Sequence, residues 1–171
     1  MVMDFLAGVI LYLAPMYFAN SSAMLLGGKT PLDLGKKFPD GRPIFGKGKT
    51  FKGFFFGTLI GTLAAFVINL LFEAQVASLL PDYMLLGFLL SLGAILGDMA
   101  GSFLKRRIGM APGKPAFFLD QLDFVAGGIL LGLPVYVPGI AQIAVMAAVT
   151  LVVHRLSNYF AYKINLKKVP W

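Results

Sequence analysis

The chain has 171 residues, of which 58% are hydrophobic and only 13% are charged, and its mean hydropathy is +0.80. A soluble domain has about 25% charged residues, so this composition excludes a water-soluble globular protein and predicts one compact domain, residues 1–171, in the bilayer. A net charge of +7 would suggest a nucleic-acid partner in a soluble protein. In membrane proteins Lys and Arg gather in cytoplasmic loops for topological reasons, so we expect no nucleic-acid partner. With no cysteine and one histidine, disulfides, thiolate metal sites and multi-histidine sites are excluded.

Long uncharged runs predict membrane-spanning helices, which need about 20 apolar residues each. Three such runs cover residues 5–26, 53–72 and 83–104, the last interrupted only by Asp98. No basic residue precedes the first run, so we expect a retained span rather than a cleaved signal peptide. The next stretch, 121–162, would be about twice the hydrocarbon thickness as one helix. It contains Pro134 and Pro138-Gly139, which disfavour a helix interior, so it is divided into two helices.

We therefore predict an all-α integral membrane protein with five transmembrane helices, at roughly 4–26, 53–73, 83–105, 120–137 and 140–162. The loops 27–52 and 106–119 and the C-terminal tail then share one side with all 15 Lys and Arg residues. The positive-inside rule makes that side cytoplasmic and places the N-terminus outside. Four spans would leave Lys163, Lys167 and Lys168 on the opposite side, which supports five.

Two of the predicted spans carry glycine at every fourth position, Gly53-Gly57-Gly61 in the second and Gly93-Gly97-Gly101 in the third. Small residues at this spacing form a smooth strip that allows close helix packing in lipid. We expect the second and third spans to be tight neighbours, with their cytoplasmic ends close together.

The third span contains a carboxylate, Asp98, whose insertion costs about 2.5–3.5 kcal/mol and therefore needs a reason. Asp98, Ser102 and Lys105 are spaced i, i+4 and i+7, so they share one helix face. This pattern suits a metal-bound polyphosphate. The alternative is a structural ion pair of Asp98 with Lys105 or Arg106.

Two more carboxylates, Asp120 and Asp123, lie three residues apart where the fourth predicted span begins. Stabilisation of a helix N-terminus is an alternative role for them. Together with Asp98 they offer hard oxygen ligands without His or Cys, which indicates Mg²⁺.

The first cytoplasmic loop is rich in Gly, Pro and Lys, and it ends in Lys47, Lys49 and Thr50 just before the helix that contains Gly53. These groups can hold an anion, although anchoring to anionic lipid is the alternative for any one lysine. The Gly-Lys-Gly-Lys-Thr run lacks the spacing of a P-loop. Near the end of the last span, we expect His154 and Arg155 to pack or to reach toward the interface.

Three of these segments resemble the CDP-archaeol synthases, archaeal relatives of the CDP-diacylglycerol synthases. Ser102-Phe-Leu-Lys105-Arg106 is similar to the S-x-x-K-R signature, and Asp120-Gln-Leu-Asp123 to D-R-x-D, with Gln121 in place of arginine. Gly46-Lys47 and Lys49-Thr50 with Gly53 are similar to the upstream G-K and K-T-x-x-G elements. The ending Val169-Pro170-Trp171 is also similar. The Pro-Gly-His-Gly-Gly stretch of the bacterial and eukaryotic enzymes is replaced by Gly113-Lys-Pro-Ala-Phe-Phe.

The resemblance implies a multi-pass cell-membrane enzyme that transfers CMP from CTP to 2,3-bis-O-(geranylgeranyl)-sn-glycerol 1-phosphate, with the active site on the cytoplasmic side. The products would be pyrophosphate and the CDP-activated diether lipid. The implied catalytic residues are Asp98, Asp120, Asp123 and Lys105, and the three aspartates would bind Mg²⁺, with Mn²⁺ as a possible substitute. The implied substrate-binding residues are Lys47, Lys49, Thr50, Gly53, Ser102 and Arg106. The alternatives are a CTP-dependent polyprenol kinase and a small membrane transporter; the sequence makes no prediction of oligomeric state.

Overall fold

The structure is a computed structural model that describes residues 1–111 and 114–164, apart from the side chain of Ala161. Sequence features at Gly113, Lys167, Lys168 and 169–171 lie outside the described residues. The described part is built from α-helices, and its only β-type pairings are two isolated bridges, Pro31 with Thr50 and Lys37 with Pro43.

Four helices are long and apolar enough to cross a membrane within the described residues: α1 (Val2–Leu25), α2 (Phe51–Leu71), α4 (Tyr83–Arg107) and α6 (Ile140–Lys163). The protein is therefore an all-α, multi-pass membrane protein. Two shorter helices complete the described fold, α3 (Glu73–Leu79) and α5 (Leu119–Gly132). The sequence analysis did not predict α3, which occupies most of the expected loop between the second and third spans.

The predicted helix 120–137 is shorter in the structure than expected. α5 has 14 residues and ends at Gly132, so it is about 21 Å long, less than the hydrocarbon thickness of about 30 Å. Pro134 has no backbone N–H and restricts the residue before it, which ends the helix. Irregular backbone then connects α5 to α6, which begins at Ile140.

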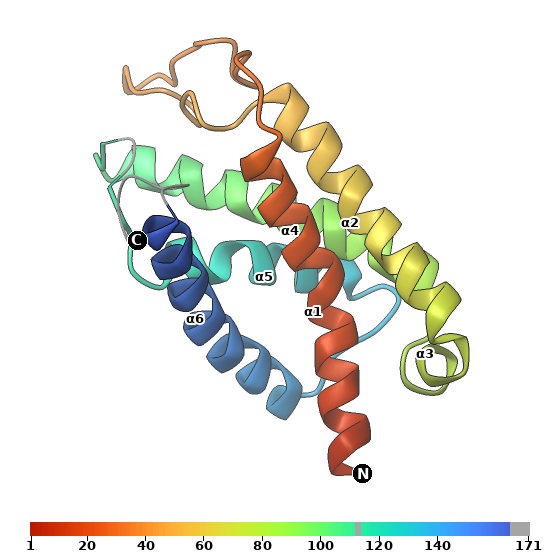
Figure 1. Cartoon of the computed structure of the whole chain (residues 1–171). Helices are drawn as coiled ribbons and strands as arrows, with labels where there is room; N and C mark the ends of the chain where they lie inside the picture. Colours follow the sequence, from red (N-terminus) through yellow and green to blue (C-terminus); the bar gives the residue numbers. More distant parts are fainter. Residues whose placement is uncertain (112–113, 165–171) are drawn as a thin grey trace.

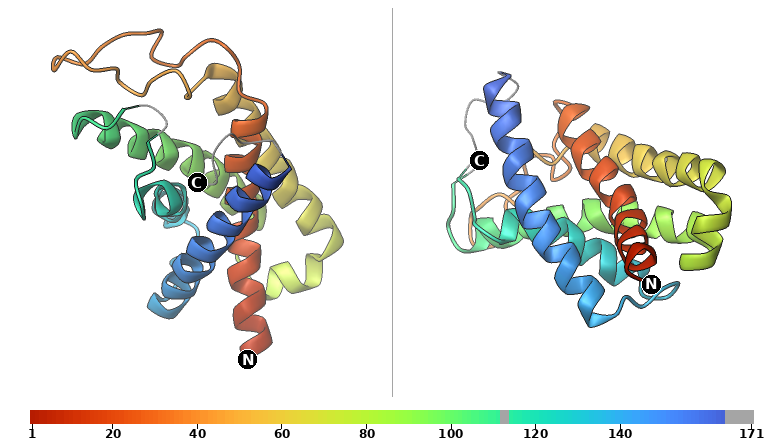
Figure 2. Two further views of the ribbon diagram at one scale, coloured as in Figure 1. Left: turned by 60° about the vertical axis from the view of Figure 1, so that its left-hand side comes forward. Right: turned by 60° about the horizontal axis from the view of Figure 1, so that its bottom comes forward.

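Figure 1 shows how the helix ends are distributed. The loop between α1 and α2, the C-terminal end of α4 and the described end of α6 lie toward one end of the molecule, and the N-terminus lies at the opposite end. Figure 1 also shows α4 and α5 running in opposite directions and crossing α1, and the left view of Figure 2 again shows the α1–α2 loop and the N-terminus at opposite ends. The loop rich in lysine and the end of the predicted third span are thus neighbours in space.

The two glycine strips do not pack against each other. Gly57 and Gly61 of α2 lie against α1 and against Ile95 and Ser91 of α4, whereas the strip on α4 lies against α5. α2 and α4 are in contact, as predicted, but Gly93 and Gly97 of the α4 strip lie against the backbone of α5. A methyl group added to Gly97 would overlap the backbone of Asp123, because α5 brings its own small residues to this crossing.

The interior is centred on α4, the most buried of the four long helices, and α6 is the least buried. The largest fully buried side chains include Tyr12, Met16, Leu86, Leu90 and Phe124. The outer face of α2 exposes Phe55, Leu63 and Leu70, as expected for a surface that faces lipid. The protein therefore buries much of α4 among the other helices and leaves Asp98 partly buried.

Candidate active site

The loop that connects α1 to α2 is folded around one buried carboxylate, Asp33, which is 6% exposed. Its Oδ1 accepts a hydrogen bond from the backbone N–H of Gly35 at 3.0 Å, and its Oδ2 accepts from Phe45 at 3.0 Å and Gly46 at 2.9 Å. Burial favours the neutral form, but these three N–H groups outweigh it and hold the pKa of Asp33 below its ordinary value. The carboxylate thus organises the loop as an anion.

The same loop is attached to the C-terminal end of α4 by two arginines. Arg42 donates hydrogen bonds from Nη1 to the carbonyl oxygens of Arg106 and Arg107, at the end of α4 where carbonyls lack intrahelical partners. Arg107 forms an ion pair with Asp40 at 2.9 Å, and its guanidinium lies 4.6 Å from the ring centre of Phe38. These contacts hold the basic loop over the end of α4.

Thr50 connects the end of α1 to the start of α2. It is 4% exposed and is the N-cap of α2. Its Oγ1 accepts hydrogen bonds from the backbone N–H groups of Gly53 at 3.1 Å and Gly28 at 3.0 Å. Because Lys49 directly precedes Thr50 in the chain, these two hydrogen bonds also fix the backbone next to Lys49.

Two lysines pair with the predicted carboxylates. Lys49 forms an ion pair with Asp98 of α4, and Lys105 of α4 forms one with Asp120 of α5. All four side chains are partly buried, and Oδ2 of Asp120 also accepts from the backbone N–H of Ala116 at 2.8 Å. The loop, α4 and α5 thus meet at a cluster of alternating charges.

The third carboxylate, Asp123, lies at the close crossing of α4 and α5. A methyl group added to Gly101 would overlap its carboxylate, and its Oδ1 accepts from the backbone N–H of Phe124 at 2.7 Å. The strip of glycines on α4 is therefore what permits this acid to lie against α4.

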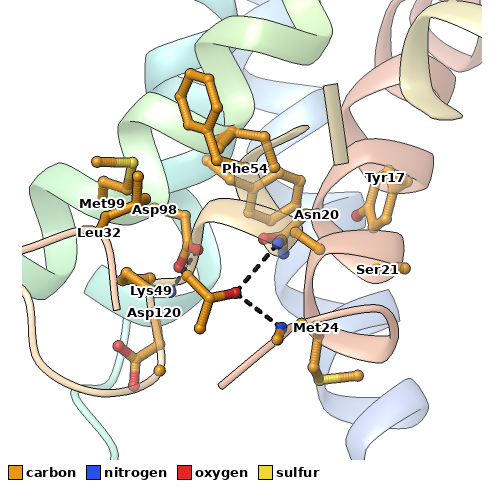
Figure 3. Close-up of a pocket in the computed structure, with 18 of the residues that line it drawn as sticks. Tyr17, Asn20, Ser21, Met24, Leu32, Lys49, Phe54, Asp98, Met99 and Asp120 are labelled. Atoms are coloured by element: carbon orange, nitrogen blue, oxygen red, sulfur yellow. Dashed lines mark hydrogen bonds and ion pairs between the residues drawn. The ribbon is translucent and has the colours of Figure 1, made fainter. Parts of the chain in front are cut away.

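A cavity of about 540 Å³ opens beside this cluster, a volume within the usual range for small-molecule sites. Figure 3 shows Lys49, Asp98 and Asp120 on one side of it, and Tyr17, Ser21 and Met24 of α1 on the other. Six of the predicted site residues line it: Lys47, Lys49, Thr50, Gly53, Asp98 and Asp120.

Four predicted residues do not line this cavity: Ser102, Lys105, Arg106 and Asp123. Lys105 is connected to it through its ion pair with Asp120. Arg106 is 6% exposed, and its Nε and Nη1 have no hydrogen-bond partner in the described part of the chain. Unsatisfied buried donors on a cation are costly, so Arg106 has capacity for an anion that the described residues do not supply.

The cavity also contains polar residues that the sequence analysis missed, above all Asn20, His154 and Asn158. Asn20 belongs to a polar run, Asn20-Ser21-Ser22, inside the first apolar span, and that interruption was the available signal. His154 was expected to have a packing or interfacial role, but the structure places it in the wall of the cavity.

Two of the three predicted aspartates line the cavity together, and a pair of carboxylates is a donor set that suits Mg²⁺. Among residues 1–111 and 114–164, no three His, Asp or Glu side chains are close enough to form a ready-made metal site. Asp98 and Asp120 both line the cavity, however, and Mg²⁺ usually takes one or two carboxylates together with substrate phosphates. A two-carboxylate site completed by a nucleotide is compatible with this geometry, and a ligand role for Asp123 stays a prediction.

Comparison with known proteins shows the family of the chain. The family model described as CarS-like, CDP-archaeol synthase, matches residues 2–171. The CDP-archaeol synthase of Pyrococcus abyssi is 46% identical over 94% of this chain and 95% of its own length. That of Pyrococcus horikoshii is 44% identical over 100% of both chains. A solved structure, described as "Structural insight into an intramembrane enzyme for archaeal membrane lipids biosynthesis", superposes with a TM-score of 0.79 at 35% identity, covering 87% of this chain and 91% of the other. The chain belongs to the CDP-archaeol synthase family.

Proposed function

We propose that this protein transfers CMP from CTP to the lipid phosphate 2,3-bis-O-(geranylgeranyl)-sn-glycerol 1-phosphate, which yields the CDP-activated diether lipid and pyrophosphate. The observation that carries the proposal is the cavity in which Lys47 and Lys49 face Asp98 and Asp120 within a membrane-embedded helical fold. It combines cations for a polyphosphate with oxygen ligands for its divalent ion. The names of the relatives support the same reaction.

We further propose that α5 is a short fifth span, with the N-terminus outside and the cavity on the cytoplasmic side. Support comes from the loop charges: Lys and Arg occur in the α1–α2 loop, around the end of α4 and in the last turns of α6. The positive-inside rule assigns those segments to the cytoplasm. The connection between Gly132 and Ile140 extends the short helix, and irregular backbone is tolerated at membrane depth where protein covers it.

In this proposal the two ion pairs are the resting state of the site. When nucleotide enters, Lys49 and Lys105 exchange their carboxylate partners for phosphate oxygens, which releases Asp98 and Asp120 to act as ligands. Mg²⁺ bound there would neutralise phosphate charge and hold the polyphosphate in a defined orientation. Asp123 supports this arrangement from the crossing of α4 and α5, and Arg106 offers its free donors to phosphate.

The reaction needs no general base, because a lipid phosphate is already an anion at neutral pH. One of its oxygens forms a bond to the α-phosphorus of CTP as the bond from that phosphorus to the oxygen bridging to the β-phosphate breaks. The bonding electrons leave with pyrophosphate. The work of the protein is therefore alignment and charge neutralisation, as in phosphoryl transfer generally.

Position-labelled CTP tests this proposal. Purified protein is incubated with Mg²⁺, the lipid phosphate and CTP labelled either at the α- or the γ-phosphate. We expect the α-label in the lipid product and the γ-label in pyrophosphate. In a parallel incubation with a polyprenol in place of the lipid phosphate, transfer of the γ-label to the polyprenol with release of CDP would instead identify a kinase. No label in any lipid, with CTP intact, would overturn the enzyme assignment.

A further inference from the structure

A second cavity, of about 420 Å³, lies beside the first. It is formed between residues 115–121 and the C-terminal half of α6, and it is lined mainly by apolar and aromatic groups such as Phe117 and Tyr159. Asp120, His154 and Asn158 line both cavities. The two cavities are therefore adjacent, with Asp120 at their common boundary.

The cation in this second cavity is Arg155. It is exposed, and its guanidinium lies 5.7 Å from the ring centre of Phe117. Lys49, Lys105 and Arg107 each pair with an aspartate, whereas Arg155 has no carboxylate within ion-pair distance among residues 1–111 and 114–164. It is a fixed positive charge available to an anion.

The position of Arg155 along α6 suits a lipid headgroup. The helix from Ile140 carries no other formal charge until Lys163, which lies about 12 Å further along the axis. A charge at this depth is costly unless it reaches polar headgroups or a polar partner. α6 is also the least buried of the long helices, so apolar chains can lie along it while a headgroup reaches Arg155.

Gln121 is a second, independent indication of a ligand. It lines the same cavity and is only 8% exposed, yet its Oε1 has no hydrogen-bond partner in the described part of the chain. Buried polar groups are almost always bonded. The Oε1 acceptor needs a donor, which a water bound to a polar ligand would supply.

We propose that the second cavity is the subsite for the lipid phosphate substrate and that Arg155 binds its phosphate group. The inference rests on the proposed function, because it supplies the acceptor to the nucleotide in the first cavity. The first cavity is lined by Lys47 and Lys49 and suits a triphosphate. The second has one cation, Arg155, and a mostly apolar surface, which suit a single phosphate on apolar chains.

Arg155 holds the oxygens of the lipid phosphate that do not react. The remaining oxygen forms its bond to the α-phosphorus of CTP at the boundary marked by Asp120, and pyrophosphate leaves through the first cavity. Loss of the arginine charge should therefore weaken lipid-phosphate binding and leave CTP binding unchanged.

The kinetic test compares Arg155→Gln with wild-type protein while the two substrates are varied independently. We expect the KM for lipid phosphate to rise about tenfold or more, because a charge-assisted hydrogen bond is lost, and the KM for CTP to stay within about twofold of wild type. Arg155→Lys should recover part of the effect. Lys163→Gln is the matched control, since it removes a positive charge from the same helix at a residue that lines neither cavity, and it should leave both KM values unchanged.

A binding measurement separates this inference from the proposed function. Thermal unfolding of each variant in detergent is followed with the diether glycerol phosphate alone and with CTP alone. The inference predicts that Arg155→Gln loses the shift caused by the lipid phosphate and keeps the shift caused by CTP. Glycerol 1-phosphate should compete with the lipid, which identifies the phosphate rather than the chains as the group bound.

The outcomes are distinct. An unchanged lipid-phosphate KM in Arg155→Gln, a loss of CTP binding instead, or an equal loss in Lys163→Gln would overturn the subsite. A wild-type protein that makes no cytidylylated lipid would overturn the proposed function. The binding shifts would still decide whether Arg155 binds a lipid phosphate.

Discussion

The hydroxyl of Thr50 provides a sharp test of how the loop, α1 and α2 are held together. Thr50→Ala removes an acceptor shared by the backbone N–H groups of Gly53 and Gly28. Loss of a helix N-cap costs about 0.5–2 kcal/mol, and a second N–H left without a partner adds about 1 kcal/mol. We expect a loss of about 1.5–3 kcal/mol in the free energy of unfolding.

Two further variants make the comparison specific. Thr50→Ser keeps the oxygen and should lose less than about 1 kcal/mol. Thr62→Ala is the matched control within α2, because the Thr62 hydroxyl donates to the carbonyl oxygen of Thr58 at 2.8 Å, which already takes part in the helix. Its removal should cost no more than about 0.5 kcal/mol.

Stability is measured by titration from dodecylmaltoside into SDS, with helix content followed by circular dichroism. Thr50 also lines the first cavity, so Thr50→Ala should raise the KM for CTP. The reasoning is refuted if Thr50→Ala unfolds at the same SDS fraction as Thr62→Ala, or if Thr50→Ser is as unstable as Thr50→Ala.

Two other changes test the crossing of α4 with α5 and the loop. Gly101→Ala places a methyl group against the carboxylate of Asp123 and should reduce turnover at least tenfold. Gly8 is a helical glycine with only ordinary contacts nearby, so Gly8→Ala should keep wild-type turnover. Equal rates in both variants would contradict the role of this crossing. Asp33 has a lowered pKa in the folded protein, so its stabilising effect is full above its ordinary pKa of about 3.9 and is lost as pH falls through the lowered value. The difference in melting temperature between wild type and Asp33→Asn should be constant from neutral pH to about pH 5 and should shrink in stronger acid; a difference that does not change with pH would contradict this explanation.

Much of the helical architecture could be predicted because each membrane span needs a long uncharged run, and charged residues mark where the run leaves the hydrocarbon. α1, α2, α4 and α6 each lie within two residues of the expected bounds. The short helix α3 follows α2 directly, and no apolar run of membrane length distinguishes it. The early end of α5 follows from Pro134, but the sequence did not show how much of the connection to Ile140 would be helical.

The sequence was sufficient to predict which kinds of side chain form the site, but not which lysine forms an ion pair with which aspartate. A carboxylate in a span and two more at a helix entry are costly enough to indicate function, and the structure places Asp98 and Asp120 at one cavity. Which lysine pairs with which aspartate depends on how the loop lies over α4, and this follows from contacts of Arg42 and Arg107 that have no sequence pattern. The strip of glycines on α4 predicted close packing with another helix but did not show which helix, because small residues at this spacing allow any helix to approach closely.

The most direct test of the central claim measures metal-dependent nucleotide binding and turnover in the aspartate variants. Asp98→Asn, Asp120→Asn and Asp123→Asn are compared with Glu73→Gln, an exposed acid in α3. Binding of Mn²⁺ in the presence of CTP is followed by electron paramagnetic resonance, and turnover by release of pyrophosphate with Mg²⁺. We predict that all three aspartate variants fold but lose turnover, that Asp98→Asn and Asp120→Asn also lose Mn²⁺ binding, and that Glu73→Gln behaves as wild type. Wild-type turnover in Asp98→Asn or Asp120→Asn, or full activity in excess chelator, would contradict the account.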